Sequence, residues 1–247
     1  MLNKFLVVFT FLICFTSSGL AQEITSIDIV TDEWDSCTLT NFTGLYFDIC
    51  RAIYEPKGIK LNIKFYPYAR TVQMMEKGQA EICIGVYTGD VSNSIYPKWN
   101  IDFDDISCIY PKSKVTKFNG VKTMENKKIA WVVDYGYEAY IEIPHQYIEV
   151  ANLESGLKML QAGRVDFVLD TKTTIEPALK ELKINASDYQ LQTLKWIKLY
   201  VCFIKNDKGK KLSEIWDQEF SKMMKSGAMK KLFQKWEFTD SFSLYAQ

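Results

Sequence analysis

An acidic residue at a predicted strand end is the side chain in this 247-residue sequence best placed to hold a ligand. Asp170 follows the run 165–169, whose mostly apolar residues are typical of a buried parallel strand. In an open α/β sheet the carboxyl ends of the strands face the ligand crevice. A carboxylate at that edge can form a charge-assisted pair with a ligand cation. The same position equally suits a cap for the following turn, so both roles stay open.

Aromatic residues occupy several other predicted strand ends and the loops beside them. Tyrosine and tryptophan can stack on a ligand or a cation and still form hydrogen bonds. With Asp170 they predict a lining that suits a cationic or amphipathic solute, although at least two of them are expected to be ordinary packing residues. The candidates are Trp34, Tyr66, Tyr68, Tyr87, Tyr135 and Tyr137.

The sequence offers little for catalysis, metal binding or nucleic-acid binding. The one histidine, His145, follows a proline between elements, where a surface or capping role is expected. No nucleophile–base spacing, phosphate loop or zinc-like cysteine spacing is present, so we expect no catalytic residue, metal or cofactor. The 30 basic and 30 acidic residues balance, which gives no indication of a nucleic-acid partner.

The first 21 residues have the pattern of a cleaved signal peptide. Lys4 precedes an apolar run at 5–15, and Gly19 and Ala21 stand at the −3 and −1 positions of a cleavage site. The apolar run is too short for a membrane anchor. We therefore expect a periplasmic protein. Export also permits disulfides, and among the five cysteines that remain Cys37 and Cys50 are the pair to test first.

The elements that position these residues follow a repeated pattern. The segments 72–85 (VQMMEKGQAEICIG) and 157–170 (LKMLQAGRVDFVLD) align without a gap, and each reads as a helix, a glycine stop and a strand. Gly78 falls on Gly163, and Glu81 falls on Asp166. The repeat indicates two similar α/β lobes, with coincidence between two ordinary units as the alternative.

The order of predicted elements gives the domain division. Each lobe reads as a β-α-β-α-β unit, and the chain crosses between lobes near Pro111 and again near 195–198. The last two predicted helices of the chain, at 213–224 and 228–236, belong to the first lobe. We predict that residues 22–110 with 199–247 form lobe 1 and that residues 111–198 form lobe 2.

The sequence resembles the bacterial periplasmic solute-binding proteins of family 3, the amino-acid-binding type. The likeness covers nearly the whole mature chain. Its segments are GLYFDICRAI, EKGQAEICIGV, IDFDDISCIYP, KKIAWVVDYGYEAY, LQAGRVDFVLD and SKMMKSGAMKKLFQKW. The resemblance implies a two-lobe type II (Venus-flytrap) fold that closes on a ligand between the lobes.

The resemblance also implies roles for individual residues. Asp170 matches the acid that takes the α-amino group of an amino-acid ligand, and Thr88 matches a threonine that follows a strand of the first lobe. Family members carry an arginine for the ligand carboxylate soon after this threonine, whereas YTGDVSNS contains none. Arg70 could reach the crevice from the start of its helix, or it could be a surface arginine. The predicted ligand-binding residues are Trp34, Tyr68, Arg70, Tyr87, Thr88, Tyr135 and Asp170.

The sequence therefore predicts a monomeric, non-catalytic solute-binding protein for a small polar metabolite. An amino acid or a related amine is the first candidate for this ligand. Its membrane partner would be an inner-membrane ABC permease. The alternatives are a ligand-sensing module for a membrane receptor and a dehydratase-like enzyme on the same fold.

Overall fold

The computed structural model describes residues 23–133 and 135–246. The predicted signal peptide lies outside these ranges. Across the described residues, every helix is too short or too polar to pass through a membrane.

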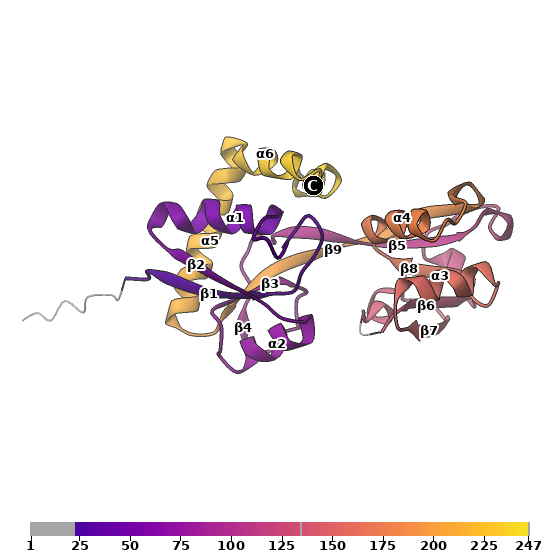
Figure 1. Ribbon diagram of the computed structural model, residues 1–247, viewed down its shortest axis with the longest axis horizontal. Helices are drawn as coiled ribbons and strands as arrows, with labels where there is room; N and C mark the ends of the chain where they lie inside the picture. The colour runs from indigo at the N-terminus through magenta and orange to yellow at the C-terminus, as the bar shows by residue number, and fades with distance from the viewer. Residues whose placement is uncertain (1–22, 134, 247) are drawn as a thin grey trace, which may run out of the picture.

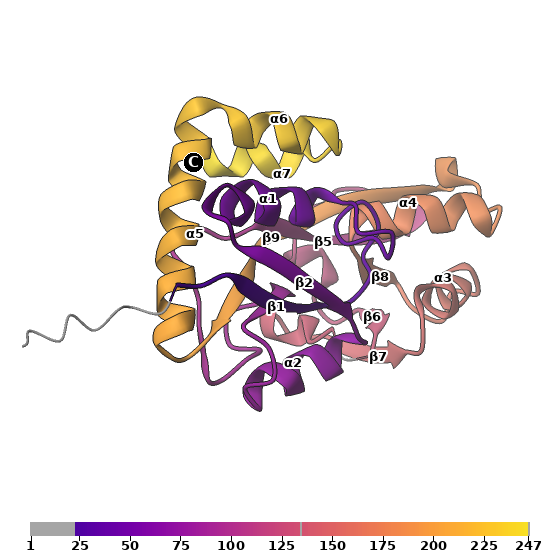
Figure 2. The same ribbon diagram turned by 60° about the vertical axis from the view of Figure 1, so that its left-hand side comes forward.

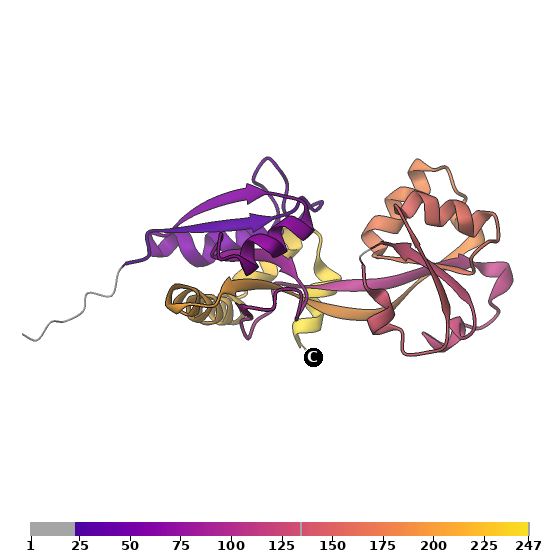
Figure 3. The same ribbon diagram turned by 90° about the horizontal axis from the view of Figure 1, so that it is seen from below.

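The chain forms two α/β lobes, as predicted. Figure 1 shows the lobes side by side along the long axis, joined by the strands β5 (Asp102–Pro111) and β9 (Tyr189–Ile204), and Figure 3 shows the same separation from below. Lobe 1 contains β1 Ser26–Thr31, α1 Leu45–Tyr54, β2 Lys60–Phe65, α2 Tyr68–Glu76, β3 Ile82–Val86, β4 Ser94–Ile95, α5 Asp207–Ser226, α6 Ala228–Lys235 and α7 Thr239–Ser243. Lobe 2 contains β6 Lys128–Val132, β7 Gln146–Val150, α3 Leu153–Gln161, β8 Phe167–Asp170 and α4 Lys172–Glu181.

Strand pairing runs continuously from one lobe to the other in the order β2-β1-β3-β9-β5-β8-β6-β7. In lobe 1, β1 pairs in parallel with β2 and β3, and in lobe 2, β6 pairs in parallel with β7 and β8. β9 and β5 are antiparallel to their neighbours. Parallel strands direct their carboxyl ends to one edge, so each lobe presents the loops after its strands together.

The hinge consists of two long strands that pair with each other. Residues 189–204 form the single strand β9, and β5 extends over Asp102–Pro111. The register of the β5–β9 pair shifts between Ile106 and Ser107, where the chain leaves lobe 1. Ser107–Ile109 also pair with β8 of lobe 2, so β5 takes part in the strand pairing of both lobes.

Each lobe has buried apolar side chains on both faces of its sheet. In lobe 1 one cluster lies under α1, α5 and α6 and includes Phe47 and Trp216, and a second lies under α2 and includes Met75. Lobe 2 has one cluster under α3 and α4 and another around Trp131. Each lobe therefore has its own core, and the hinge strands are the main connection between them.

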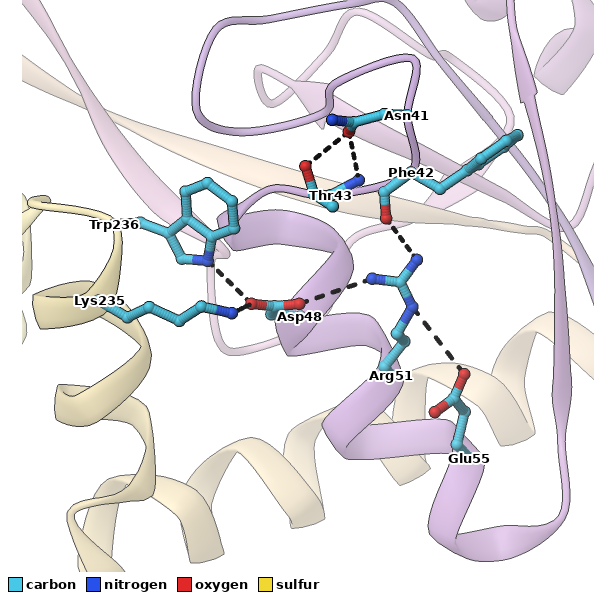
Figure 4. A network of polar contacts seen from close by, with 8 residues as sticks. All are labelled: Asn41, Phe42, Thr43, Asp48, Arg51, Glu55, Lys235 and Trp236. Carbon is cyan, nitrogen blue, oxygen red and sulfur yellow. Dashed lines mark hydrogen bonds and ion pairs between the residues drawn. The ribbon is translucent and has the colours of Figure 1, made fainter.

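The C-terminal helices are fastened to lobe 1. Figure 2 shows α6 beside α1, and α7 packs against α6 and β5. Figure 4 shows how the Asp48 carboxylate of α1 accepts hydrogen bonds from Lys235 Nζ at 2.6 Å and from Trp236 Nε1 at 2.8 Å. Arg51 lies 3.5 Å from the other oxygen of Asp48, so one side chain of α1 holds the end of α6.

The cysteines and the histidine take structural positions. All five described cysteines are buried free thiols, so the Cys37–Cys50 pair is not bonded in this structure. His145 Nδ1 lies 2.6 Å from the carbonyl oxygen of Ile143, and its ring is 6.0 Å from that of Trp131.

Candidate ligand-binding site between the lobes

The loop after β1 places an aromatic ring over the end of β3. The Trp34 backbone N–H donates to Thr38 Oγ1 at 3.1 Å, and the Trp34 carbonyl accepts from the N–H of Thr38 at 2.9 Å. Gly85 in β3 has φ +80°, and a Cβ there would collide with the Trp34 ring. The glycine therefore leaves the space that the half-buried indole fills at this strand end.

Two further aromatics of lobe 1 share one carboxylate. Tyr68, at the start of α2, lies edge-on to Trp34 with ring centroids 6.2 Å apart. The Tyr68 hydroxyl donates to Asp90, and the Tyr87 backbone N–H donates to the same Asp90 oxygen at 2.8 Å. The structure thus brings the predicted residues Trp34, Tyr68 and Tyr87 together at the carboxyl ends of the lobe 1 strands.

Tyr87 connects lobe 1 to the hinge and to lobe 2. Its hydroxyl donates to Asp104 Oδ2 in β5 at 2.6 Å. Its ring lies edge-on to Tyr140 of lobe 2, with centroids 6.5 Å apart. Burial raises the pKa of Asp104 to about 6, against the lowering effect of the Tyr87 hydrogen bond. This side chain therefore spans the region between the lobes.

Asp170, at the end of β8, is 1% exposed. Its Oδ1 accepts from the Thr171 N–H at 2.8 Å, whereas its Oδ2 is buried and has no hydrogen-bond partner among the described atoms. Burial raises the pKa of Asp170 to about 7, and the carboxylates of Asp104 and Asp105 add to the effect. A buried acceptor without a donor is costly, so this oxygen is available for a ligand donor.

Tyr135 and Tyr137 follow β6 and complete the aromatic set on lobe 2. Their rings are edge-on with centroids 5.4 Å apart, and Tyr137 is buried whereas Tyr135 is 39% exposed. Burial raises the pKa of Tyr135 to about 12, with contributions from Asp170 and Asp104. The pKa of Tyr137 is also raised, by burial and then by the same two carboxylates. Both tyrosines therefore lie in the field of the acids at the inter-lobe region.

The structure does not gather the remaining two predicted residues into this set. Arg70 is exposed in the first turn of α2, two residues after Tyr68, and residues two apart in a helix point to different sides. Thr88 is exposed in the loop after β3. A ligand contact for either residue stays a prediction.

The inter-lobe region is rich in carboxylates. Asp105 of β5 accepts from Ser107 Oγ and from the Lys172 N–H, the latter at 2.9 Å, and burial raises its pKa. Among the ion pairs of the described residues, none joins a lysine or arginine to Asp90, Asp104, Asp105 or Asp170. In the part of the chain that the structure describes, no group of acidic, histidine or cysteine side chains is arranged to hold a metal ion. The arrangement can therefore neutralise an organic cation held among aromatic rings.

Comparison with known proteins identifies the fold. No protein-family model matches the sequence, and no curated protein has a significant sequence match to it. Solved structures do match. The chain is similar to the GluR0 ligand-binding core from Nostoc punctiforme in complex with L-glutamate, with 15% identity, TM-score 0.63, and coverage of 85% of this chain and 98% of that one. It thus has the two-lobe fold of the periplasmic solute-binding proteins.

Two further structures with this fold give the same picture. A substrate-binding protein of an ABC uptake transporter from Streptococcus pneumoniae with bound histidine has 17% identity and TM-score 0.61, covering 88% of this chain and 94% of that one. An ancestral amino acid-binding protein, described as a precursor of cyclohexadienyl dehydratase, has 14% identity and TM-score 0.62, covering 86% and 95%. At such identities the likeness establishes the shared fold, while this chain's ligand depends on its own residues.

Within the solute-binding fold, sequence reasoning missed part of the site. The acids Asp90, Asp104 and Asp105 and the aromatic Tyr140 were not predicted as site residues. For Asp104 and Asp105 a signal was present, because three acids stand within residues 102–105, directly before an apolar run. Asp90 occupies the segment where the resemblance predicts an arginine, and this reversal of charge was a second signal.

Proposed function

We propose that this chain is an exported solute-binding protein that holds a small polar metabolite with an amino group, an amino acid or a related amine, between its lobes. Delivery to a membrane transporter would follow. The observation that carries the proposal is Asp170, a buried carboxylate whose Oδ2 lacks a donor at the carboxyl end of β8. An ammonium group would supply that donor and the opposite charge.

The fold supports a closing mechanism. The lobes have separate cores and are joined by the β5–β9 pair, whose register shifts at Ile106/Ser107. A ligand that contacts Tyr87 of lobe 1 and Asp170 of lobe 2 would stabilise whichever relative position of the lobes lets both contacts form. Binding energy then selects a closed state that a membrane partner can recognise.

The test is a thermal-shift screen of the purified protein against amino acids, amines, organic acids and short peptides. A ligand at a hundred times its Kd stabilises the folded state by about 2.7 kcal/mol, which is a readily measured rise in Tm. Amines or amino acids should raise the Tm of the wild type but not that of Asp170→Asn. The matched control is Asp188→Asn, because Asp188 is an exposed carboxylate of the same lobe.

Two results would contradict the proposal. One is a screen in which no amine or amino acid changes the Tm. The other is a ligand whose shift is the same in Asp170→Asn as in the wild type, since that ligand would bind elsewhere.

A further inference from the structure

The inter-lobe region has an excess of negative charge, and among the described residues none of its four aspartates forms an ion pair with a lysine or arginine. Asp90 lies in the loop after β3, Asp104 and Asp105 lie in β5, and Asp170 ends β8. Asp90 and Asp104 accept hydrogen bonds from tyrosines, and Asp105 accepts from Ser107 and a backbone N–H. These donors are neutral. The Lys172 charge lowers the pKa of Asp105, but burial outweighs it and that pKa stays raised. Asp170 Oδ2 lacks even a neutral donor.

A ligand carboxylate would find poor partners in this region. The described cation that contacts its aromatic set is Lys195 of β9, whose Nζ lies 5.3 Å from the Tyr140 ring centroid. The Lys195 side chain is exposed on the hinge, and Arg70 is exposed on α2. A carboxylate placed near Asp104 or Asp170 would instead meet like charges in a poorly hydrated site, where repulsion is strong.

The aromatic residues favour a ligand with a cationic end and an apolar body. Tyr135 presents an exposed ring beside buried Tyr137, and Tyr87 faces Tyr140 across the lobes. Such ring faces attract ammonium groups and pack against methylene groups. A cation with a hydrocarbon body can use both surfaces, and it brings no group that needs an anion-binding partner.

We propose that the ligand is an organic amine that carries no carboxylate. This inference rests on the proposed function and makes it narrower, since an amino acid would satisfy that function equally well. Asp170 Oδ2 would accept from the ammonium group, Asp104 would lie within the same electrostatic field, and the tyrosines of both lobes would contact the rest of the molecule.

Calorimetric titration with matched ligand pairs tests the inference. The probes are cadaverine and L-lysine, agmatine and L-arginine, and tyramine and L-tyrosine, because each pair differs by one carboxylate. At least one amine should bind the wild-type protein about tenfold or more tightly than its parent amino acid, and Asp170→Asn should weaken that amine about a hundredfold. If the amino acids bind as tightly as the amines or more tightly, the inference is wrong while the proposed function stands. If the amines and amino acids all fail to bind, both are wrong.

A substitution of Lys195 provides a second, independent test of the inference. Lys195→Met removes the cation nearest the aromatic set without a large change in side-chain length. Amine affinity should then be unchanged or rise by about two- to fivefold, because a like charge has been removed. A tenfold loss of affinity in this variant would mean that the ligand presents an anion to Lys195, and it would overturn the inference. Lys198→Met, an exposed lysine of the same strand, is the control.

Discussion

The two lobes contain the same local unit with different chemistry at its end. In lobe 1 the unit is α2, Gly78 and β3, and in lobe 2 it is α3, Gly163 and β8. Gly78 has φ +68° and Gly163 has φ +67°. Their N–H groups donate to Met75 and Leu160 carbonyls, each at 3.0 Å, as expected where a left-handed glycine ends a helix. The sequence repeat therefore corresponds to a repeat in backbone structure.

The acids of the two units also take matching positions. Glu81 accepts from the Asp28 N–H of β1 at 2.6 Å, and Asp166 accepts from the Lys128 N–H of β6 at 3.1 Å. In each case the acid precedes a strand and accepts from a backbone N–H in the first half of the neighbouring parallel strand. Position 85 falls on position 170, and there the units diverge. One holds the glycine that admits Trp34, and the other holds the buried carboxylate. The backbone unit is repeated, whereas at this one position lobe 1 makes room for an indole ring and lobe 2 places a carboxylate.

The largest effect is expected from removing the lobe 1 glycine. Gly85→Ala would place a methyl group against the Trp34 ring at a backbone φ of +80°. Left-handed strain and overpacking together should lower the free energy of unfolding by about 2–5 kcal/mol, measured by urea denaturation. The control is Gly89→Ala. Gly89 has φ +103° and open space around its Cβ position, so this substitution introduces backbone strain without a side-chain collision. Adding Trp34→Ala to Gly85→Ala should recover part of the loss. Equal losses for Gly85→Ala and Gly89→Ala would show that the Trp34 contact is unimportant.

A smaller effect, on affinity, is expected from the protonation of the lobe 2 carboxylate. The pKa values of Asp170 and Asp104 are raised by burial to about 7 and about 6, from an ordinary value of 3.8. Because a cation favours the ionised form, amine binding below these pKa values must release protons. Affinity for cadaverine should rise by up to about tenfold per pH unit for each proton released between pH 5 and pH 7, and level off above. Calorimetry at each pH, in buffers of different ionisation enthalpy, counts the protons.

The same raised pKa values determine whether the stability of the unliganded protein rises or falls with pH. Acids with raised pKa values hold their protons longer in the folded protein than in the unfolded chain. Their contribution is fully present below pH 3.8 and is lost as pH rises through about 6 to 7. Unliganded wild type should therefore lose stability relative to Asp170→Asn between about pH 4 and pH 7, with no further loss above. Affinity and stability curves that are flat across this range would show that these carboxylates ionise normally.

The sequence predicted the lobes because their elements obey simple periodicities. Apolar residues at helical spacing and a glycine stop located α2 and α3, and apolar runs located β3 and β8. The hinge escaped this reasoning. Residues 102–105 include three aspartates, and residues 194–198 mix lysines with Trp196, so neither segment shows the apolar pattern of a strand. These residues are strands because β5 and β9 pair with each other, a contact between segments far apart in the sequence.

The sequence named some residues of the candidate site for a related reason. Asp170, Trp34, Tyr68 and Tyr87 stand at strand or helix ends, which topology places at one edge of each sheet. Partners such as Asp90 and Asp104 depend on loop paths. Tyr87 meets Asp104 and Tyr68 meets Asp90 through contacts between residues 17 and 22 apart in the chain. No local periodicity encodes such contacts, so the gathering of these acids around the tyrosines became visible only in three dimensions.

The smallest effect is expected at the matching acids that precede the two strands. Glu81 Oε1 pairs with Lys208 Nζ at 2.9 Å, whereas Asp166 pairs with Lys114 Nζ at 3.4 Å, and the lobe 2 pair is the more exposed. Each acid also binds a backbone N–H, more closely in lobe 1. Glu81→Gln should therefore lower the free energy of unfolding by about 1–2 kcal/mol and Asp166→Asn by about 0.5–1 kcal/mol. Urea denaturation at low and high salt separates the ion-pair part, which salt screens, from the hydrogen bond, which it leaves. A larger loss for Asp166→Asn than for Glu81→Gln would mean that the acid contributes more in lobe 2 than these distances and exposures indicate.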